Sequence, residues 1–266
     1  MGGILYVVGT PIGNLGDMSP RACEVLESVD FIAAEDTRVT VKLLNHFDIK
    51  KPLISYFEHN KYEKGEMIIN RILAGENCAL VSDAGMPAIS DPGEMLVAQA
   101  HEKGVKVESV PGPSACVTAL SISGMPSGRF CFEGFLSVNK VSRKEHLEEI
   151  KNEKRTLIFY EAPHKLLATL NDLLNALGDR KIAVIKELTK IHETVLKTTL
   201  SEAVAYIKDN APKGEYVLII DGAKPTEKLT YTIEEATQMA KNLIDGGTSH
   251  SAAAKEIAQL TGIKKG

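Results

Sequence analysis

Short apolar runs rich in β-branched residues recur along the chain, and segments with helical spacing separate them. Each run has the length of a buried strand, and each intervening segment is long enough for a crossover helix. This alternation is typical of α/β domains, in which helices cover sheets of parallel strands. The sequence therefore predicts an α/β protein. In the first half we expect one sheet, built from the strands 5–8, 31–34, 53–57, 79–81 and 105–110.

The segment 20–29 shows how the helices are recognised. Ser19 is a suitable N-cap, and Pro20 suits the first turn because its missing N–H is not needed there. Ala22, Val25 and Leu26 then follow at helical spacing and form one apolar stripe. We expect this stripe to pack on the sheet.

A second set of strands and helices follows residues 121–128, a stretch rich in turn formers that we take as a domain boundary. The predicted organisation is an α/β domain over 1–120, a second α/β domain over 121–223 and a helical tail over 224–266. The second set comprises strands 130–135, 156–160, 182–185, 195–199 and 216–220, helices 143–151, 164–177 and 201–208, and tail helices 233–244 and 252–260.

Charge and cysteine content exclude several classes of protein. The 31 basic and 35 acidic residues give a net charge of -4, so no global positive field attracts nucleic acid or an anionic membrane. The four cysteines form no C-x-x-C pair, which argues against a zinc ribbon and a disulfide scaffold. The first residues lack the basic region and the long apolar run of a signal peptide. We therefore expect a cytoplasmic protein.

Three loops rich in Gly and Pro each follow a predicted strand: residues 9–14, 82–93 and 111–115. Ligands of open α/β sheets bind outside the carboxyl ends of the strands, where these loops would meet. A single such loop is explained by a tight turn that needs a positive φ. Three together, one of them twelve residues long with two acids, favour a binding site.

The standard fingerprints do not identify the ligand. Neither G-x-G-x-x-G nor G-x-x-x-x-G-K-[ST] occurs, so Glu35, which has the spacing of a ribose-binding acid, gives only a weak dinucleotide signal. Residues 112–116 resemble a G-x-S-x-G nucleophile elbow around Ser114, but Cys116 replaces the last Gly. No H-E-x-x-H occurs, and no metal is implied.

Charged residues close strands at 35–38, 161–165 and 186–190. Each segment alone is explained by a solvated rim or a helix cap. Together they would place acids and bases around one cleft between two domains, which is a preferred location for ligands.

These segments make the chain similar to the tetrapyrrole-methylase-like methyltransferases, and in particular to the branch that methylates a cytidine ribose in 16S ribosomal RNA. The resemblance covers residues 4–222 and implies two α/β domains, S-adenosylmethionine in the cleft between them, a homodimer and 2′-O-methylation of small-subunit ribosomal RNA. It rests on residues 9–14, 33–38, 81–85, 90–93, 111–114, 129–135, 156–161 and 186–190, in that order.

The same resemblance implies the residues that contact the methyl donor. Met86 stands where the family has Thr, which we expect to change loop packing more than activity. The sequence stops at Gly266, whereas the family pattern continues into another helix, so we expect either a truncated tail or weaker RNA docking through it. The tail is expected either to contact RNA or to pack as a surface or dimer-packing helix pair. The implied donor contacts are Thr10, Pro11, Asp83, Ala84, Gly85, Ile89, Ser90, Pro113, Ser114, Ala115, Tyr160 and Leu188.

Methyl transfer to a ribose hydroxyl needs positioning and a proton acceptor. We predict Glu187 and Asp36 as candidate bases. Arg38, Lys186 and Lys190 are candidates for binding the phosphates beside the target nucleotide.

Three other functions remain open from the sequence. The same fold could methylate a small molecule or a tetrapyrrole, Ser114 could be the nucleophile of a hydrolase, or the chain could bind RNA without catalysis. Replacing Ser114 by Ala would abolish hydrolysis, but it would only weaken donor binding in a methyltransferase.

Overall fold

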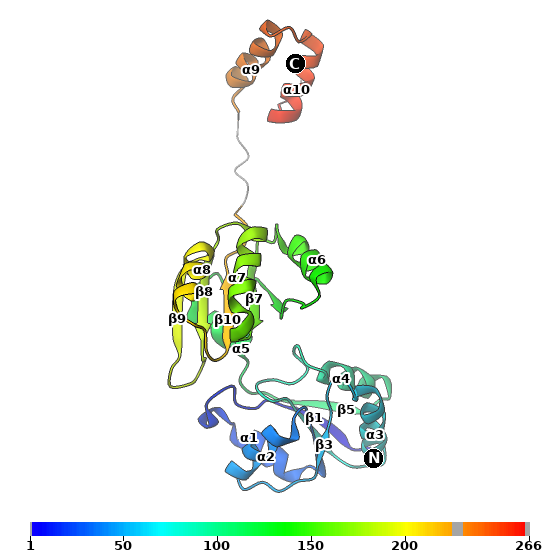
Figure 1. Cartoon of the computed structure of the whole chain (residues 1–266). Helices are drawn as coiled ribbons and strands as arrows, with labels where there is room; N and C mark the ends of the chain where they lie inside the picture. The colour runs from blue at the N-terminus through cyan, green and yellow to red at the C-terminus, as the bar shows by residue number, and fades with distance from the viewer. Residues whose placement is uncertain (1, 225–230, 264–266) are drawn as a thin grey trace. The chain divides into compact units, whose positions relative to one another are not determined.

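The computed structural model describes residues 2–224 and 231–263. The chain divides into two compact units, Met1–Ala223 and Lys224–Gly266 (Figure 1). Within the described residues, the first unit holds two five-stranded sheets and the second holds two helices. The predicted α/β class is confirmed.

The first sheet is entirely parallel, with the strand order β3-β2-β4-β1-β5. Helices α1 (Pro20–Ser28) and α2 (Thr37–His46) pack on one face, where Leu26 and Leu44 are buried. Helices α3 (Lys61–Leu73) and α4 (Gly93–Glu102) cover the other (Figure 1). The five strands are β1 (Ile4–Val8), β2 (Phe31–Ala34), β3 (Leu53–Ser55), β4 (Cys78–Val81) and β5 (Lys106–Val110).

The predicted strands of this sheet are confirmed, with small differences at their ends. The helix predicted over 20–29 is α1, and the Ser19 hydroxyl accepts a hydrogen bond from the Ala22 N–H as its cap. Consecutive strand residues alternate between the two cores: Leu5 faces α3 and α4, whereas Val8 faces α1 and α2. Both sheet faces are therefore apolar, as in other parallel sheets.

The second sheet has the order β6-β7-β10-β8-β9, and only β6 and β7 are parallel. The expectation of parallel strands is therefore wrong for this sheet. Residues 187–193 link β8 to β9, which is too short for a crossover and makes the pair antiparallel. The strands are β6 (Phe130–Gly134), β7 (Thr156–Glu161), β8 (Lys181–Lys186), β9 (Thr194–Thr199) and β10 (Tyr216–Ile220).

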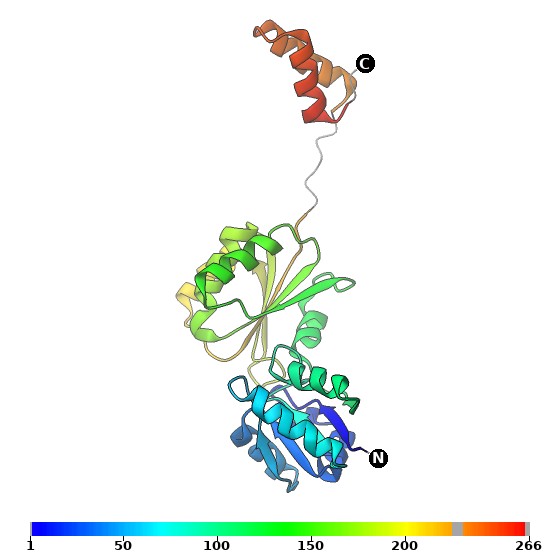
Figure 2. The same cartoon turned by 90° about the vertical axis from the view of Figure 1, so that its right-hand side faces the viewer.

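Helices cover both faces of the second sheet. Helices α6 (Lys140–Ile150), α7 (Pro163–Leu177) and α8 (Leu200–Asp209) share one core with it (Figure 2). Helix α5 (Ala115–Ser123) packs on the opposite face, against β7, β8 and β10. The predicted turn-rich stretch 121–128 thus begins inside a helix, which ends at Gly124 in a left-handed conformation. Leu120 and Ser123 are buried, so the last turn of this helix packs in the core before the chain reaches Gly124.

The second unit consists of α9 (Ile233–Asp245) and α10 (His250–Thr261), and both predicted tail helices are confirmed. Thr232 and Glu235 form a capping box at the start of α9, and the Ser249 hydroxyl caps α10. Ala236, Ala253 and Ile257 are the buried side chains of these helices. Among the residues that the structure describes, no helix has the length and apolar character needed to cross a membrane.

The backbones that follow β1 and β5 lie unusually close together. A Cβ on Gly9 would lie 2.6 Å from the Gly112 Cα, and a Cβ on Gly112 would lie 2.8 Å from the Gly9 Cα. Only glycine at both positions permits this approach, because side-chain atoms cannot occupy space filled by backbone. The pair holds two of the Gly/Pro loops together.

Replacing Gly9 by Ala should lower the free energy of unfolding by about 1–3 kcal/mol, because the added methyl group overpacks a backbone contact. Chemical denaturation measures the change. Gly128→Ala is the matched control, since a Cβ there meets nothing within 4 Å, and its stability should stay near that of the parent chain. Equal stability of the two variants would contradict the close-approach account.

Candidate active site

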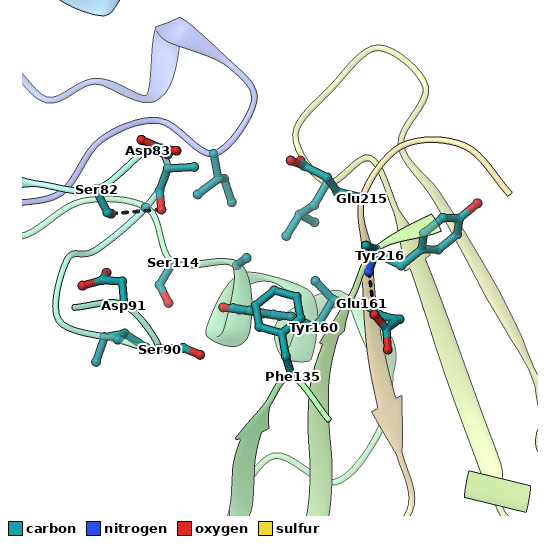
Figure 3. Close-up of a pocket in the computed structure, with 18 of the residues that line it drawn as sticks. Ser82, Asp83, Ser90, Asp91, Ser114, Phe135, Tyr160, Glu161, Glu215 and Tyr216 are labelled. Carbon is teal, nitrogen blue, oxygen red and sulfur yellow. Dashed lines mark hydrogen bonds between the residues drawn. The ribbon is translucent and has the colours of Figure 1, made fainter. Parts of the chain in front are cut away.

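A pocket of about 440 Å³ lies in the first unit and is lined by segments that flank both sheets (Figure 3). Its walls include the loop after β4, the start of α5 and residues at the ends of β7, β8 and β10. The volume falls within the range of small-molecule sites. The lining residues are Ile12, Glu35, Ser82, Asp83, Ala84, Gly85, Met86, Ile89, Ser90, Asp91, Ser114, Ala115, Phe135, Tyr160, Glu161, Ala162, Pro163, Ile185, Leu188, Glu215, Tyr216 and Val217.

The loop after β4 is held in place by the loop after β1. The Thr10 N–H donates to the Gly85 carbonyl at 3.0 Å, and the Gly85 N–H donates to the Thr10 carbonyl at 3.1 Å. Gly85 has a φ of 84°, which suits glycine. Thr10 is buried and lies outside the pocket lining, so in this structure it supports the wall rather than forming it.

The same loop contains backbone strain close to the pocket. Ala88 and Ser90 have φ values of 65° and 66°, a region that side-chain-bearing residues rarely adopt. The Asp91 carboxylate accepts hydrogen bonds from the Ala88 N–H at 3.0 Å and the Gly93 N–H at 2.8 Å. These bonds stabilise a conformation that is unfavourable by itself, as is common at functional sites.

One wall of the pocket is acidic. Burial raises the pKa of Glu35, and the neighbouring charges of Asp83 and Asp91 raise it further. Burial is also the main cause of the raised pKa of Asp83 and of Asp91. A wall of partly buried carboxylates is stabilised by a bound cation, which removes their mutual repulsion.

The opposite wall is aromatic (Figure 3). The Tyr160 ring packs edge to face against Phe132 at 4.9 Å and Phe135 at 5.7 Å between centroids. Burial raises the pKa of Tyr160 to about 12, so its hydroxyl stays protonated at neutral pH. Phe135 lines the pocket while 55% exposed, which leaves apolar surface open to a ligand.

The structure brings most of the predicted donor-contacting residues together. Thr10, Pro11 and Pro113 are not among the pocket-lining residues. Met86, the departure from the family pattern, does line the pocket. The predicted contacts found in the lining are Asp83, Ala84, Gly85, Ile89, Ser90, Ser114, Ala115, Tyr160 and Leu188.

Asp36 and Arg38 form a pair outside the pocket lining. Arg38 Nη2 lies 2.6 Å from Asp36 Oδ2, and the Arg38 backbone N–H donates to Asp36 Oδ1 at 2.8 Å. These side-chain and backbone hydrogen bonds lower the pKa of Asp36 to about 2. Asp36 also caps α2, and its N–H donates to Asp83 Oδ1 at 3.0 Å. The Arg38 side chain is 87% exposed and accessible to a large partner.

Glu187, Lys190 and Lys186 also lie outside the pocket lining. Glu187 Oε1 accepts hydrogen bonds from the Glu215 N–H at 2.9 Å and from Lys190 Nζ at 3.0 Å. Both bonds lower the pKa of Glu187, and the bond from Glu215 has the larger effect. Lys190 also pairs with Glu215 at 2.9 Å. Glu187 and Lys190 therefore attach the loop that carries Leu188 to the start of β10. Lys186 is the last residue of β8.

Several pocket residues were not singled out from the sequence. Glu35 appeared as a weak dinucleotide signal and within longer motifs, and Phe135 and Glu161 appeared only within longer motifs. Glu161 is buried, and it accepts hydrogen bonds from the Thr169 hydroxyl at 2.5 Å and the Ala162 N–H at 2.9 Å. Glu215 precedes β10 and carried no motif. The signal that could have found Glu35 and Glu161 is an acid at the carboxyl end of a buried strand.

The hydrolase alternative lacks a histidine base in this geometry. Ser114 lines the pocket at the N-cap of α5, but the pocket lining contains no histidine in the part of the chain that the structure describes. A serine nucleophile needs a base within hydrogen-bond reach, most often a histidine. Ser114 is therefore better suited to contacting a ligand.

Comparison with known proteins defines the class. Residues 4–204 match the model of the tetrapyrrole (corrin/porphyrin) methylases. The fold resembles a diphthine synthase, with a TM-score of 0.64 and 16% identity over 82% of this chain and 90% of that one. It also resembles the uroporphyrin-III-C-methyltransferase from Thermus thermophilus, with a TM-score of 0.59 and 18% identity over 82% and 94%. The chain belongs to the tetrapyrrole methylase family.

Within this class, the chain matches one set of relatives over nearly its whole length. It is 48% identical to a Synechocystis protein named ribosomal RNA small subunit methyltransferase I, over 99% of this chain and 95% of the relative. The Escherichia coli O157:H7 protein of the same name is 44% identical, over 99% and 92%.

Replacing Asp91 by Ala should release the loop at Ala88 and lower the free energy of unfolding by about 1–3 kcal/mol, because the Ala88 and Gly93 N–H groups lose their acceptor. Thermal denaturation measures the stability, and hydrogen exchange measures protection of the Ala88 and Gly93 amides. Asp91→Asn keeps an acceptor oxygen and should retain most of the protection. Exposed Glu94 provides the control Glu94→Ala. Unchanged protection in Asp91→Ala would show that the carboxylate does not brace the loop.

Proposed function

We propose that this chain transfers a methyl group from S-adenosylmethionine to the 2′-hydroxyl of a cytidine ribose in small-subunit (16S) ribosomal RNA. The observation that carries the proposal is the 44–48% identity, over 99% of the chain, to proteins named ribosomal RNA small subunit methyltransferase I. The family match supports a methyltransferase independently of these names. No comparable observation favours a tetrapyrrole or another small molecule as the acceptor.

The pocket fits the proposed donor in size and in charge. When bound, S-adenosylmethionine supplies an activated methyl group on a positively charged sulfur. Asp83 and Asp91 offer negative charge to a cation, while Ile12, Leu188 and Val217 offer apolar surface to the rest of a ligand. We propose the nine predicted residues in the lining as donor contacts, with Thr10, Pro11 and Pro113 supporting them from behind the wall.

Catalysis by this site would come mainly from positioning. Well-oriented reactants recover about 7–11 kcal/mol of the barrier, whereas a proton acceptor contributes roughly 10²–10⁴-fold. The loop after β4 and the segment around Leu188 would therefore have the larger effect by holding the donor. Asp36 and Glu187 stay predictions as proton acceptors. Asp36 already binds the Arg38 side chain, and Glu187 binds the Lys190 side chain. Each also accepts a backbone N–H, and these contacts weaken both carboxylates as bases.

We further propose that Arg38, Lys186 and Lys190 bind phosphates near the target, and that the helices α9 and α10 contact the RNA. The exposed Arg38 side chain can release Asp36 and bind a phosphate instead, because the planar guanidinium group matches the geometry of phosphate oxygens. Such contacts position the RNA, and its shape and unstacked bases would provide specificity. A cytoplasmic homodimer is part of the same proposal.

Incubation with labelled S-adenosylmethionine should label small ribosomal subunits that lack the modification, and nucleoside analysis should place the label on a cytidine ribose. Naked RNA and a tetrapyrrole precursor are the parallel acceptors. Ser114→Ala should weaken donor binding but retain transfer at saturating donor. Label on the tetrapyrrole alone would contradict the proposed acceptor. Donor binding with no transfer to any acceptor would also contradict the proposed function.

Removal of the second unit should separate RNA binding from donor binding. A chain ending at Ala223 keeps the whole pocket and should bind the donor as the full chain does. Its affinity for the small subunit should fall at least tenfold, or about 1.4 kcal/mol. Calorimetry measures the first and filter binding the second. Unchanged affinity for the small subunit would exclude the helices from RNA contact.

A further inference from the structure

Five carboxylates line the pocket, and four of them have structural partners. Asp83 accepts the Asp36 N–H, and Asp91 accepts two N–H groups of its own loop. The partners of Glu161 are the Thr169 hydroxyl and the Ala162 N–H, and Glu215 pairs with Lys190. Each of these four contacts supports the wall, and protonation of the carboxylate would weaken it, because a charged acceptor binds a donor more strongly than a neutral one.

Glu35 differs from the other four. Within the described residues it forms no ion pair and caps no helix, and its one hydrogen-bond donor is the Asp83 backbone N–H. It is part of the pocket lining and only partly buried. With this single donor and no cation partner among the described residues, its carboxylate keeps an oxygen available to a substrate.

The topology of the first sheet fixes the position of Glu35. Strand β2 pairs with β4 in register, with Ala34 opposite Val81. Glu35 and Ser82 are the first residues after these two strands, so Glu35 lies beside the loop that begins the acidic wall. A residue next to a buried strand is held more precisely than one in the middle of a loop.

We propose that Glu35 is the general base that accepts the proton of the ribose 2′-hydroxyl. This assignment rests on the proposed methyl transfer. The O–H bond breaks as the oxygen forms its bond to the methyl carbon, and the proton moves to a Glu35 carboxylate oxygen. The carbon–sulfur bond breaks with its electron pair left on sulfur, so the positive sulfur and the negative carboxylate both become neutral. A partly buried site favours such a step, because opposite charges disappear from a medium of low dielectric constant.

The electrostatic surroundings match this role. Burial, Asp83, Asp91 and Asp36 all raise the pKa of Glu35, which strengthens it as a base. The pKa of Asp36 is lowered to about 2, and that of Glu187 is also lowered, so both bind a proton weakly. A catalytic base works best when its pKa lies close to the working pH.

Replacing Glu35 by Gln should lower the single-turnover rate at saturating donor and RNA by roughly 10²–10⁴-fold. Donor affinity by calorimetry and RNA affinity by filter binding should change less than about threefold, or 0.7 kcal/mol. In the parent chain the rate should rise with pH up to the pKa of Glu35, and this dependence should disappear in the variant. Exposed Glu24 on α1 gives the control Glu24→Gln, with the parent rate.

A carbon-13 NMR titration of the glutamate carboxyls provides a readout that does not depend on activity. One signal, missing from Glu35→Gln, should titrate above the usual range for glutamate. Glu35→Asp keeps the charge and should retain part of the rate if Glu35→Gln fails to fold.

Each contrary outcome has a separate meaning. No transfer by the parent chain would remove the proposed function itself. A parent-like rate for Glu35→Gln, together with a large loss in Asp36→Asn or Glu187→Gln, would overturn the Glu35 assignment alone. If Glu35→Gln lost donor affinity but kept a normal rate at saturating donor, Glu35 would be a binding residue. That result would also overturn its assignment as the general base.

Discussion

The paired hydrogen bonds between Thr10 and Gly85 are the interaction on which the site depends. They join the loop after β1 to the loop after β4 across the edge of the first sheet. The contact between Gly9 and Gly112 brings the third loop against the first. Because these contacts involve backbone, they fix the loops without using side chains that a ligand needs. The pocket wall can then hold Ala88 and Ser90 in unfavourable conformations.

This frame also explains the electrostatics of the pocket. Three acids, Glu35, Asp83 and Asp91, share one wall, and burial raises the pKa of each. Partial burial of like charges destabilises a protein unless a cation or hydrogen bonds compensate. Backbone N–H groups compensate Asp91, whereas Glu35 has only one such donor. A cationic donor would relieve the remaining repulsion among these carboxylates, which connects the electrostatic cost of the acidic wall to binding of a sulfonium compound.

Local sequence signals predicted much of the fold, since apolar periodicity and caps act over a few residues. Ser19, Pro20 and the stripe of α1 are an example. The direction of the strands in the second sheet was predicted wrongly, because it depends on the short link between β8 and β9 and on the insertion of β10 between β7 and β8.

The three-loop site was predicted in outline, but the roles of individual charges were not available from local signals. The ion pair of Asp36 with Arg38 lies within three residues and could have been read as a helix cap. The contact of Glu187 with Glu215 joins residues far apart in the sequence and needs the folded chain. Glu35 received no role of its own from the sequence, although its position at a strand end was the informative feature.

The most direct test of the account is a crystal structure of the full chain with S-adenosylmethionine. The account predicts the donor between the loop after β4 and Leu188, with its methyl group facing the side of the pocket that holds Glu35. A donor bound elsewhere, or a methyl group enclosed out of reach of Glu35, would contradict it.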